Sequence, residues 1–131
     1  AITFPSGSVT EELDSDGLHS GVTNSARITI PAGGGGWYAI GGNVRWETNA
    51  TGVRVLWVEY NGSAGSGTAI TESRIAASGS ATQTSQLVST VYLLASGDYV
   101  TLNVRQTSGG AKDVQSSGFS ARFYAVRLFS V

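Results

Sequence analysis

The sequence predicts an all-β domain built as an antiparallel sandwich of two sheets. Three observations predict this class. Apolar residues recur at every second position in several short runs, which is the period of a β-strand. Glycine occurs 18 times and clusters between those runs, where the chain has to turn. No run has the three-to-four spacing of an amphipathic helix. The 131 residues fit a single domain covering residues 1–131.

The predicted strands follow one another at short intervals. Ile2–Phe4 is expected to form the opening strand, and apolar and polar residues then alternate over Ala26–Ile30 and Tyr38–Trp46. Further alternating runs cover Leu87–Leu94 and Val100–Arg105. β-Branched and aromatic side chains are frequent in these runs, as strands prefer. Short strands separated by Gly/Ser turns favour a sandwich or a barrel.

Two further runs, Val53–Tyr60 and Phe119–Leu128, are apolar on both faces. A sandwich strand has one face in the core and the other in water, so a second apolar face needs its own cover. The simplest cover is another copy of the chain in a closed cyclic assembly. The alternative is a surface that merely tolerates scattered aromatic residues.

Composition excludes several classes of partner. Eight Lys and Arg residues face nine Asp and Glu residues, giving a net charge of −1, so the chain has no basic surplus for binding nucleic acid. No apolar run approaches the ~18 residues of a membrane span, so no membrane insertion is expected. Cysteine is absent, which excludes disulfides and thiolate metal ligands.

Candidate catalytic and metal-binding residues are few. His19 is the single histidine, and the acidic segment Glu11–Asp16 lies nearby. This segment could hold calcium, but a solvated acidic loop is the favoured interpretation because the spacing of helix–loop–helix calcium sites is missing. Gly33–Gly36 leads into Trp37 and has no Gly-Lys-Ser/Thr, so it is no phosphate loop. The sequence therefore predicts a protein that is not an enzyme, with no catalytic residue, no cofactor and no metal.

Trp37 is a candidate ligand-binding residue. It follows the glycine run, so its indole ring could stand at a loop tip and stack on a sugar. The alternative is that Trp37 closes one end of the sandwich.

Four sequence blocks then occur in a fixed order. The first joins Ile28–Pro31 through glycines to Trp37–Ile40, and the second is Val53–Tyr60 followed by Asn-Gly. The third, Leu93–Leu102, has Gly-Asp between apolar residues, and the fourth is Phe119–Phe123. In this order the blocks resemble those of complement-one-q-like and tumour-necrosis-factor-like (TNF-like) domains. The chain departs from the family pattern at Ala121, where glycine is typical, and at two arginines, Arg122 and Arg127.

The resemblance implies an antiparallel two-sheet jelly roll of about ten strands that assembles as a tight homotrimer. In such trimers one sheet faces the three-fold axis, and the family's closing, central and Gly-Asp strands are expected to share that sheet. Aromatic and arginine side chains commonly anchor interfaces. The candidate trimer contacts on these strands are Trp57, Tyr60, Tyr99, Arg105, Arg122, Phe123 and Tyr124.

The expected function follows from a trimeric jelly roll without cysteine, collagen-like stalk or signal-peptide pattern. We expect a structural or adhesion module of a virus particle, from a bacteriophage head fibre, tail fibre or capsid decoration. Its partners would be other virion proteins or a host-surface glycan, and its location the virion. The alternative is a secreted complement-like or lectin-like recognition domain.

Overall fold

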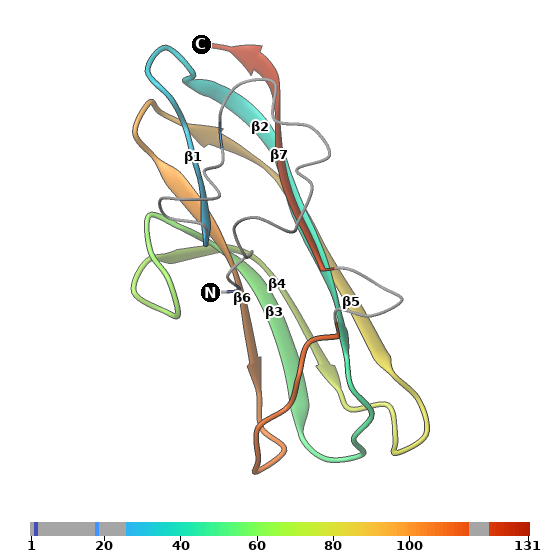
Figure 1. The fold of residues 1–131 in the computed structure, drawn as a ribbon. Helices are drawn as coiled ribbons and strands as arrows, with labels where there is room; N and C mark the ends of the chain where they lie inside the picture. Colours follow the sequence, from blue (N-terminus) through green and yellow to red (C-terminus); the bar gives the residue numbers. More distant parts are fainter. Residues whose placement is uncertain (1, 3–17, 19–25, 116–120) are drawn as a thin grey trace, which may run out of the picture.

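The structure is a computed structural model that describes residues 2, 18, 26–115 and 121–131. In this part the chain forms seven β-strands and no helix (Figure 1). The strands are β1 (Arg27–Thr29), β2 (Gly36–Trp46), β3 (Val53–Tyr60), β4 (Thr68–Ala76), β5 (Thr84–Leu94), β6 (Tyr99–Gln106) and β7 (Arg122–Ser130).

The strands form two antiparallel sheets, with the orders β1-β6-β3-β4 and β5-β2-β7. The chain changes sheet at every connection between these strands except the one from β3 to β4. Figure 1 shows the sheets as two layers, with β2 and β7 running side by side along one of them. The predicted all-β, two-sheet antiparallel class is therefore confirmed for the described residues.

The hydrophobic core lies between the two sheets and is formed by alternate residues of the strands. Ile40 and Val44 of β2 are fully buried, as are Leu56 and Val58 of β3. The remaining buried members of this cluster are Ile28, Ile30, Tyr38, Trp46, Val88, Leu94, Val100 and Leu102. The period of two in the sequence thus corresponds to the inward faces of β2, β3 and β6, whose apolar residues form this core.

One polar side chain joins the sheets through the core. Gln86 of β5 accepts a hydrogen bond from Trp46 Nε1 at 2.7 Å and donates from Nε2 to the carbonyl oxygens of Arg54 and Ser73 in the opposite sheet. Gln86 is 4% exposed, so these bonds replace the water that its amide loses on burial.

The strand boundaries agree closely with the sequence analysis in the centre of the chain. Val53–Tyr60 is β3 as predicted, whereas β4 was not anticipated from the sequence. The run predicted from Phe119 is β7 from Arg122 to Ser130; Ala121 precedes the strand, and residues 116–120 lie outside the described part. Of the predicted opening strand only Ile2 is described, and its N–H donates to Leu102 O at 2.8 Å.

The outer side of β3 is covered by the chain itself. Val55 is 2% exposed and Glu59 is fully buried, although both face away from the core residues Leu56 and Val58. Residues 61–67, between β3 and β4, fold back so that the N–H groups of Gly65 and Gly67 donate to the Glu59 carboxylate. Val55 and Glu59 are thus already buried within one chain and do not need the second copy that the sequence analysis expects as the simplest cover.

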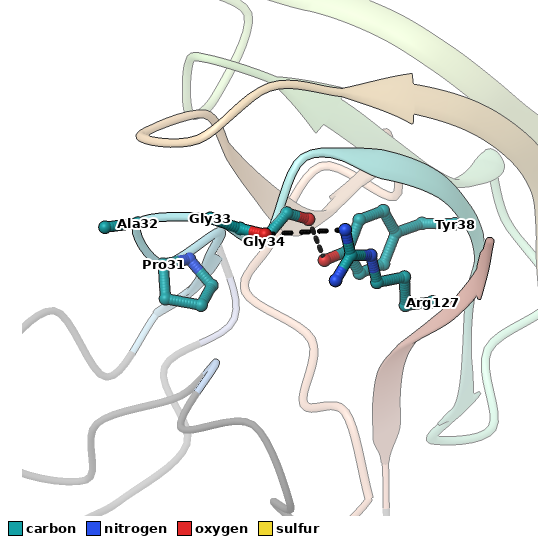
Figure 2. Close-up of a pocket in the computed structure, with 6 residues that line it drawn as sticks. All are labelled: Pro31, Ala32, Gly33, Gly34, Tyr38 and Arg127. Carbon is teal, nitrogen blue, oxygen red and sulfur yellow. Dashed lines mark hydrogen bonds between the residues drawn. The ribbon is translucent and has the colours of Figure 1, made fainter. Parts of the chain in front are cut away.

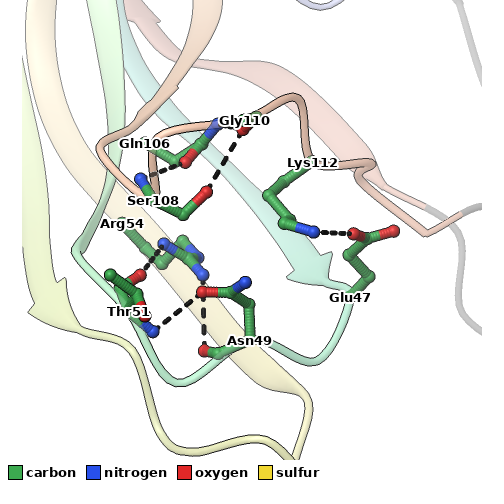
Figure 3. A network of polar contacts seen from close by, with 8 residues as sticks. All are labelled: Glu47, Asn49, Thr51, Arg54, Gln106, Ser108, Gly110 and Lys112. Atoms are coloured by element: carbon green, nitrogen blue, oxygen red, sulfur yellow. Dashed lines mark hydrogen bonds and ion pairs between the residues drawn. The ribbon is translucent and has the colours of Figure 1, made fainter.

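The loops at the end of the sandwich near Glu47 are tied together by polar contacts (Figure 3). Lys112 Nζ lies 2.9 Å from Glu47 Oε1, and this hydrogen bond lowers the pKa of the Glu47 carboxyl. Arg54 donates to the carbonyl oxygens of Thr51 at 3.1 Å and Asn49 at 3.4 Å. These contacts join the β2–β3 loop to the segment after β6 and to the buried arginine.

Candidate functional site: an exposed apolar sheet face

The outward side of the β5-β2-β7 sheet carries large apolar side chains that the described chain leaves open. Leu87 of β5 is 71% exposed and Val126 of β7 is 54% exposed. We call this surface the apolar face and define it by Trp37, Leu87, Val91, Leu93, Tyr124, Val126, Leu128 and Phe129. Of the nine large hydrophobic residues exposed in the described part of the chain, seven belong to it. Large apolar patches of this kind mark interaction sites.

The strand register aligns these side chains in rows across the sheet. Ala39 in the central strand β2 pairs with Val91 on one side and with Val126 on the other. Directly opposite residues of an antiparallel pair point to the same side of the sheet, so these three form one apolar row. Trp37 pairs in the same way with Leu93 and Phe129, which gives a second row.

A β-bulge widens the apolar face near the end of β7. Tyr38 pairs with Arg127 and Trp37 pairs with Phe129, so Leu128 is an extra residue without a partner on β2. Leu128 is 48% exposed and Phe129 is 59% exposed. Bulges re-aim side chains, and here two consecutive residues present apolar atoms to solvent.

Tyr124 lies across the middle of the apolar face. It pairs with Gly41 of β2, and a Cβ atom at Gly41 would lie 2.5 Å from Tyr124 Oη. The Tyr124 side chain thus lies across the β2 backbone in the space that a larger residue would fill. Gly41 is required here for this close approach of a ring, which is a known use of glycine within strands.

Charged side chains are confined to one end of the apolar face. Arg122 pairs with Asn43, and Arg45 lies two residues further along β2 on the same side. No acidic residue occurs on β2, β5 or β7. The buried centres of protein interfaces are poor in charged residues. The apolar rows, rather than this charged end, are therefore suited to burial against another surface.

Trp37 is not at a loop tip. It is the second residue of β2, it is partly buried, and its ring centroid lies 6.3 Å from that of Phe129. Trp37 therefore belongs to a strand and does not stand at the tip of the glycine turn, and its binding of a ligand stays a prediction. Its ring contributes instead to one row of the apolar face.

The candidate trimer contacts do not share one sheet. The closing strand β7 lies in the β5-β2-β7 sheet, whereas the central strand β3 and the Gly-Asp strand β6 lie in the other. The expectation that these three strands form a single axis-facing sheet is wrong. Tyr124 and Arg122 lie on the apolar face, and Phe123, on the opposite side of β7, packs against the core.

The other four predicted contacts lie on β3 and β6. Trp57 is half-buried and donates from Nε1 to Glu59, while Arg105 is exposed. Tyr60 packs against the core, and its hydroxyl donates to Asp98 at 3.1 Å, which raises the Tyr60 pKa. The Tyr99 ring lies under the guanidinium of Arg27, 4.5 Å from its centroid. Three of the four side chains therefore have partners within their own chain.

The described residues carry no cluster of three or more histidine or acidic side chains that could hold a metal ion. His19 and the acidic segment Glu11–Asp16 lie outside the described residues. The residues that the structure describes include no helix that could span a membrane.

Comparison with known proteins gives no relative by sequence. No family model matches the chain, and no curated protein matches it.

Proposed function

We propose that this chain is a non-enzymatic homotrimeric module of a virus particle, with a structural or adhesive role. The observation that carries the proposal is the apolar face of the β5-β2-β7 sheet. Its two rows of apolar side chains extend over all three strands, and a soluble monomer rarely leaves so much apolar surface in water. Association of three copies around an axis would bury this surface in each of them.

We also propose that the sandwich is a TNF-like jelly roll. The supporting observation is the repeated change of sheet between successive strands, since jelly rolls are two-sheet structures formed by Greek-key connections. In this interpretation the β5-β2-β7 sheet is the one that faces the three-fold axis. The assignment differs from the one expected from the sequence, because it moves the contacts from β3 and β6 to β5 and β2.

An adhesive trimer would present three copies of any ligand site. Linked sites raise the overall strength of binding by increasing the effective concentration at the second and third contact. A repeated target, such as a host-surface glycan or a lattice of virion subunits, suits that arrangement. The competing role, a secreted complement-like or lectin-like recognition domain, would use the same trimer.

Two measurements test the proposal. Light scattering coupled to size-exclusion chromatography should give three times the mass of the chain at micromolar concentration, and a monomer would overturn the assembly. The genes beside the coding sequence test the role separately. Neighbouring capsid or tail genes support the virion, whereas an encoded secretion signal preceding this domain would favour the secreted recognition protein.

A further inference from the structure

A small pocket lies where the β1–β2 turn meets β7, at the end of the sandwich opposite the Glu47 loops (Figure 2). Its volume is about 210 Å3. The lining residues are Pro31, Ala32, Gly33, Gly34, Tyr38 and Arg127. Arg127 pairs with Tyr38 in the sheet, so its side chain leaves β7 on the inner side and reaches the glycine turn. The pocket is therefore distinct from the apolar face, which lies on the other side of the same strands.

Arg127 brings a positive charge to this pocket and forms no ion pair with the acidic residues that the structure describes. Its Nη2 donates to Gly33 O at 3.4 Å and to Gly35 O at 2.5 Å. Its Nε is buried and has no hydrogen-bond partner, and its Nη1 makes none of the hydrogen bonds of the described chain. A guanidinium has five N–H groups, and here only the two on Nη2 have hydrogen-bond acceptors. The two carbonyl dipoles orient the group but leave its full charge in place.

Arg54 provides an internal comparison. It too has a buried Nε without a partner and is held by backbone carbonyl groups, and its guanidinium lies 5.7 Å from the ring centroid of Trp46. Both of its terminal nitrogens are hydrogen-bonded, and the side chain is completely enclosed. Arg54 is thus a structural arginine that holds the Thr51 loop. Arg127 differs because it lines an open pocket and keeps one terminal nitrogen unpaired.

We propose that this pocket binds a carboxylate group through Arg127. Charge-assisted hydrogen bonds between arginine and carboxylate are short and strong, and an arginine presented without a counterion is poised to form them. Among the described residues that line the pocket, Arg127 is the one charged side chain, so none of them repels an anion. The volume is below the ~300 Å3 of a site for a whole small molecule, and therefore admits the carboxylate and the carbons next to it. Uronic acids carry a carboxylate of this kind and serve as probes of the site.

This site goes beyond the assembly proposed above and does not depend on it. Glucuronate and glucose form a suitable pair of probes. They share the same ring, but glucuronate carries a carboxylate where glucose carries a hydroxymethyl group. In 1H–15N NMR titrations of the full chain, glucuronate should shift the amide signals of Gly33 and Gly34 saturably, and glucose should not. Binding of a single group to a small pocket corresponds to a Kd of roughly millimolar. Equal shifts with both sugars would overturn the proposal.

Variants assign the effect to the residue. Arg127→Gln should weaken glucuronate binding by about tenfold or more, and Arg127→Lys should retain part of it because the charge remains. Arg74→Gln removes an exposed arginine of β4 and serves as the matched control, with binding unchanged. Undiminished binding by Arg127→Gln, or tighter binding of inorganic phosphate than of glucuronate, would refute a carboxylate site. Light scattering of the same samples shows whether assembly changes, which separates failure of this site from failure of the trimer.

Discussion

The hydroxyl group of Tyr124 lies against the backbone of Gly41, so close that a Cβ atom at Gly41 would be 2.5 Å from it. This contact joins the edge strand β7 to the central strand β2 on the apolar face. A side chain at position 41 would also come within 2.7 Å of Val88 O in β5. The position of the Tyr124 ring over β2 therefore depends on the absence of a side chain at position 41.

Gly41→Ala should lift the Tyr124 ring and strain the β2–β5 ladder. We expect a loss of about 1–3 kcal/mol in the free energy of unfolding, as for other overpacked sites, together with weaker trimer formation. Urea unfolding and light scattering measure the two effects. Gly110→Ala is the control, because a Cβ there meets nothing within 4 Å, and it should change stability by less than about 0.5 kcal/mol. Equal behaviour of the two variants would contradict the close contact.

Val126→Glu should dissociate the trimer into folded monomers. Val126 is 54% exposed in the apolar row that runs through Ala39, so a carboxylate is tolerated in the monomer but is costly once copies cover it. Ile75→Glu is the matched control, because Ile75 is 37% exposed on β4 and lies outside the apolar face. Size-exclusion chromatography with light scattering distinguishes the outcomes. A trimer that persists in Val126→Glu, or one lost in both variants, would argue against this face as the interface.

Glu59→Gln should release the loop of residues 61–67. Both carboxylate oxygens of Glu59 accept hydrogen bonds from backbone N–H groups, and the amide nitrogen of glutamine would oppose one of these donors. An unsatisfied buried donor costs about 1–3 kcal/mol. Faster amide hydrogen exchange at Gly65 and Gly67 would report the release. Glu72→Gln, which affects an exposed ion pair, should leave that exchange unchanged.

Glu59 also predicts how stability depends on pH. Burial raises its pKa, but the hydrogen bonds from Gly65, Gly67 and Trp57 outweigh burial, so the folded pKa lies below the ordinary value. The unfolded chain then takes up a proton at a higher pH than the folded chain. The contribution is complete at neutral pH and is lost as the pH falls below about 5 and through the folded pKa. Urea unfolding between pH 7 and pH 3 should show a shallower decline for Glu59→Gln than for the unmodified chain, and identical declines would contradict this.

Gln86→Leu should destabilise the sandwich although it adds apolar volume to the core. The substitution removes the acceptor of the Trp46 indole N–H and the donor to Arg54 O and Ser73 O. Leaving such buried groups unpaired costs about 1–3 kcal/mol each. Thermal unfolding followed by Trp fluorescence measures the loss. A melting temperature equal to that of the unmodified chain would show that these bonds between the sheets are dispensable.

The strands whose apolar residues have a clear period were predicted from the sequence. The structure explains why another strand was missed. Val53–Tyr60 was found because both of its faces are apolar, and the run ending at Leu94 was found because apolar residues recur at every second position, where buried and exposed residues alternate along most of β5. The strand β4 was missed because its residues, Thr68 to Ala76, are mostly small or polar and only Ile70 packs against the core. An edge strand of this kind carries too few buried side chains to produce a period.

Only part of the apolar face was predicted from the sequence. Tyr124 was identified because β7 is apolar on both sides, and the same signal was present on β5, where Leu87, Val91 and Leu93 alternate with buried residues. Which strands share a sheet is set by long-range pairing, and the sequence holds no local signal for it. For the same reason the cover over Glu59 was unforeseen, since it depends on how residues 61–67 fold back over the sheet.

The rows of apolar side chains on the β5-β2-β7 sheet have a thermal consequence. Removal of such surface from water lowers the heat capacity, and its driving force near room temperature is mostly entropic. Copies joined through this face should hold together more firmly on warming above room temperature, and should loosen in the cold. Chilling the protein, rather than heating it, is then the gentlest way to obtain its separate subunits.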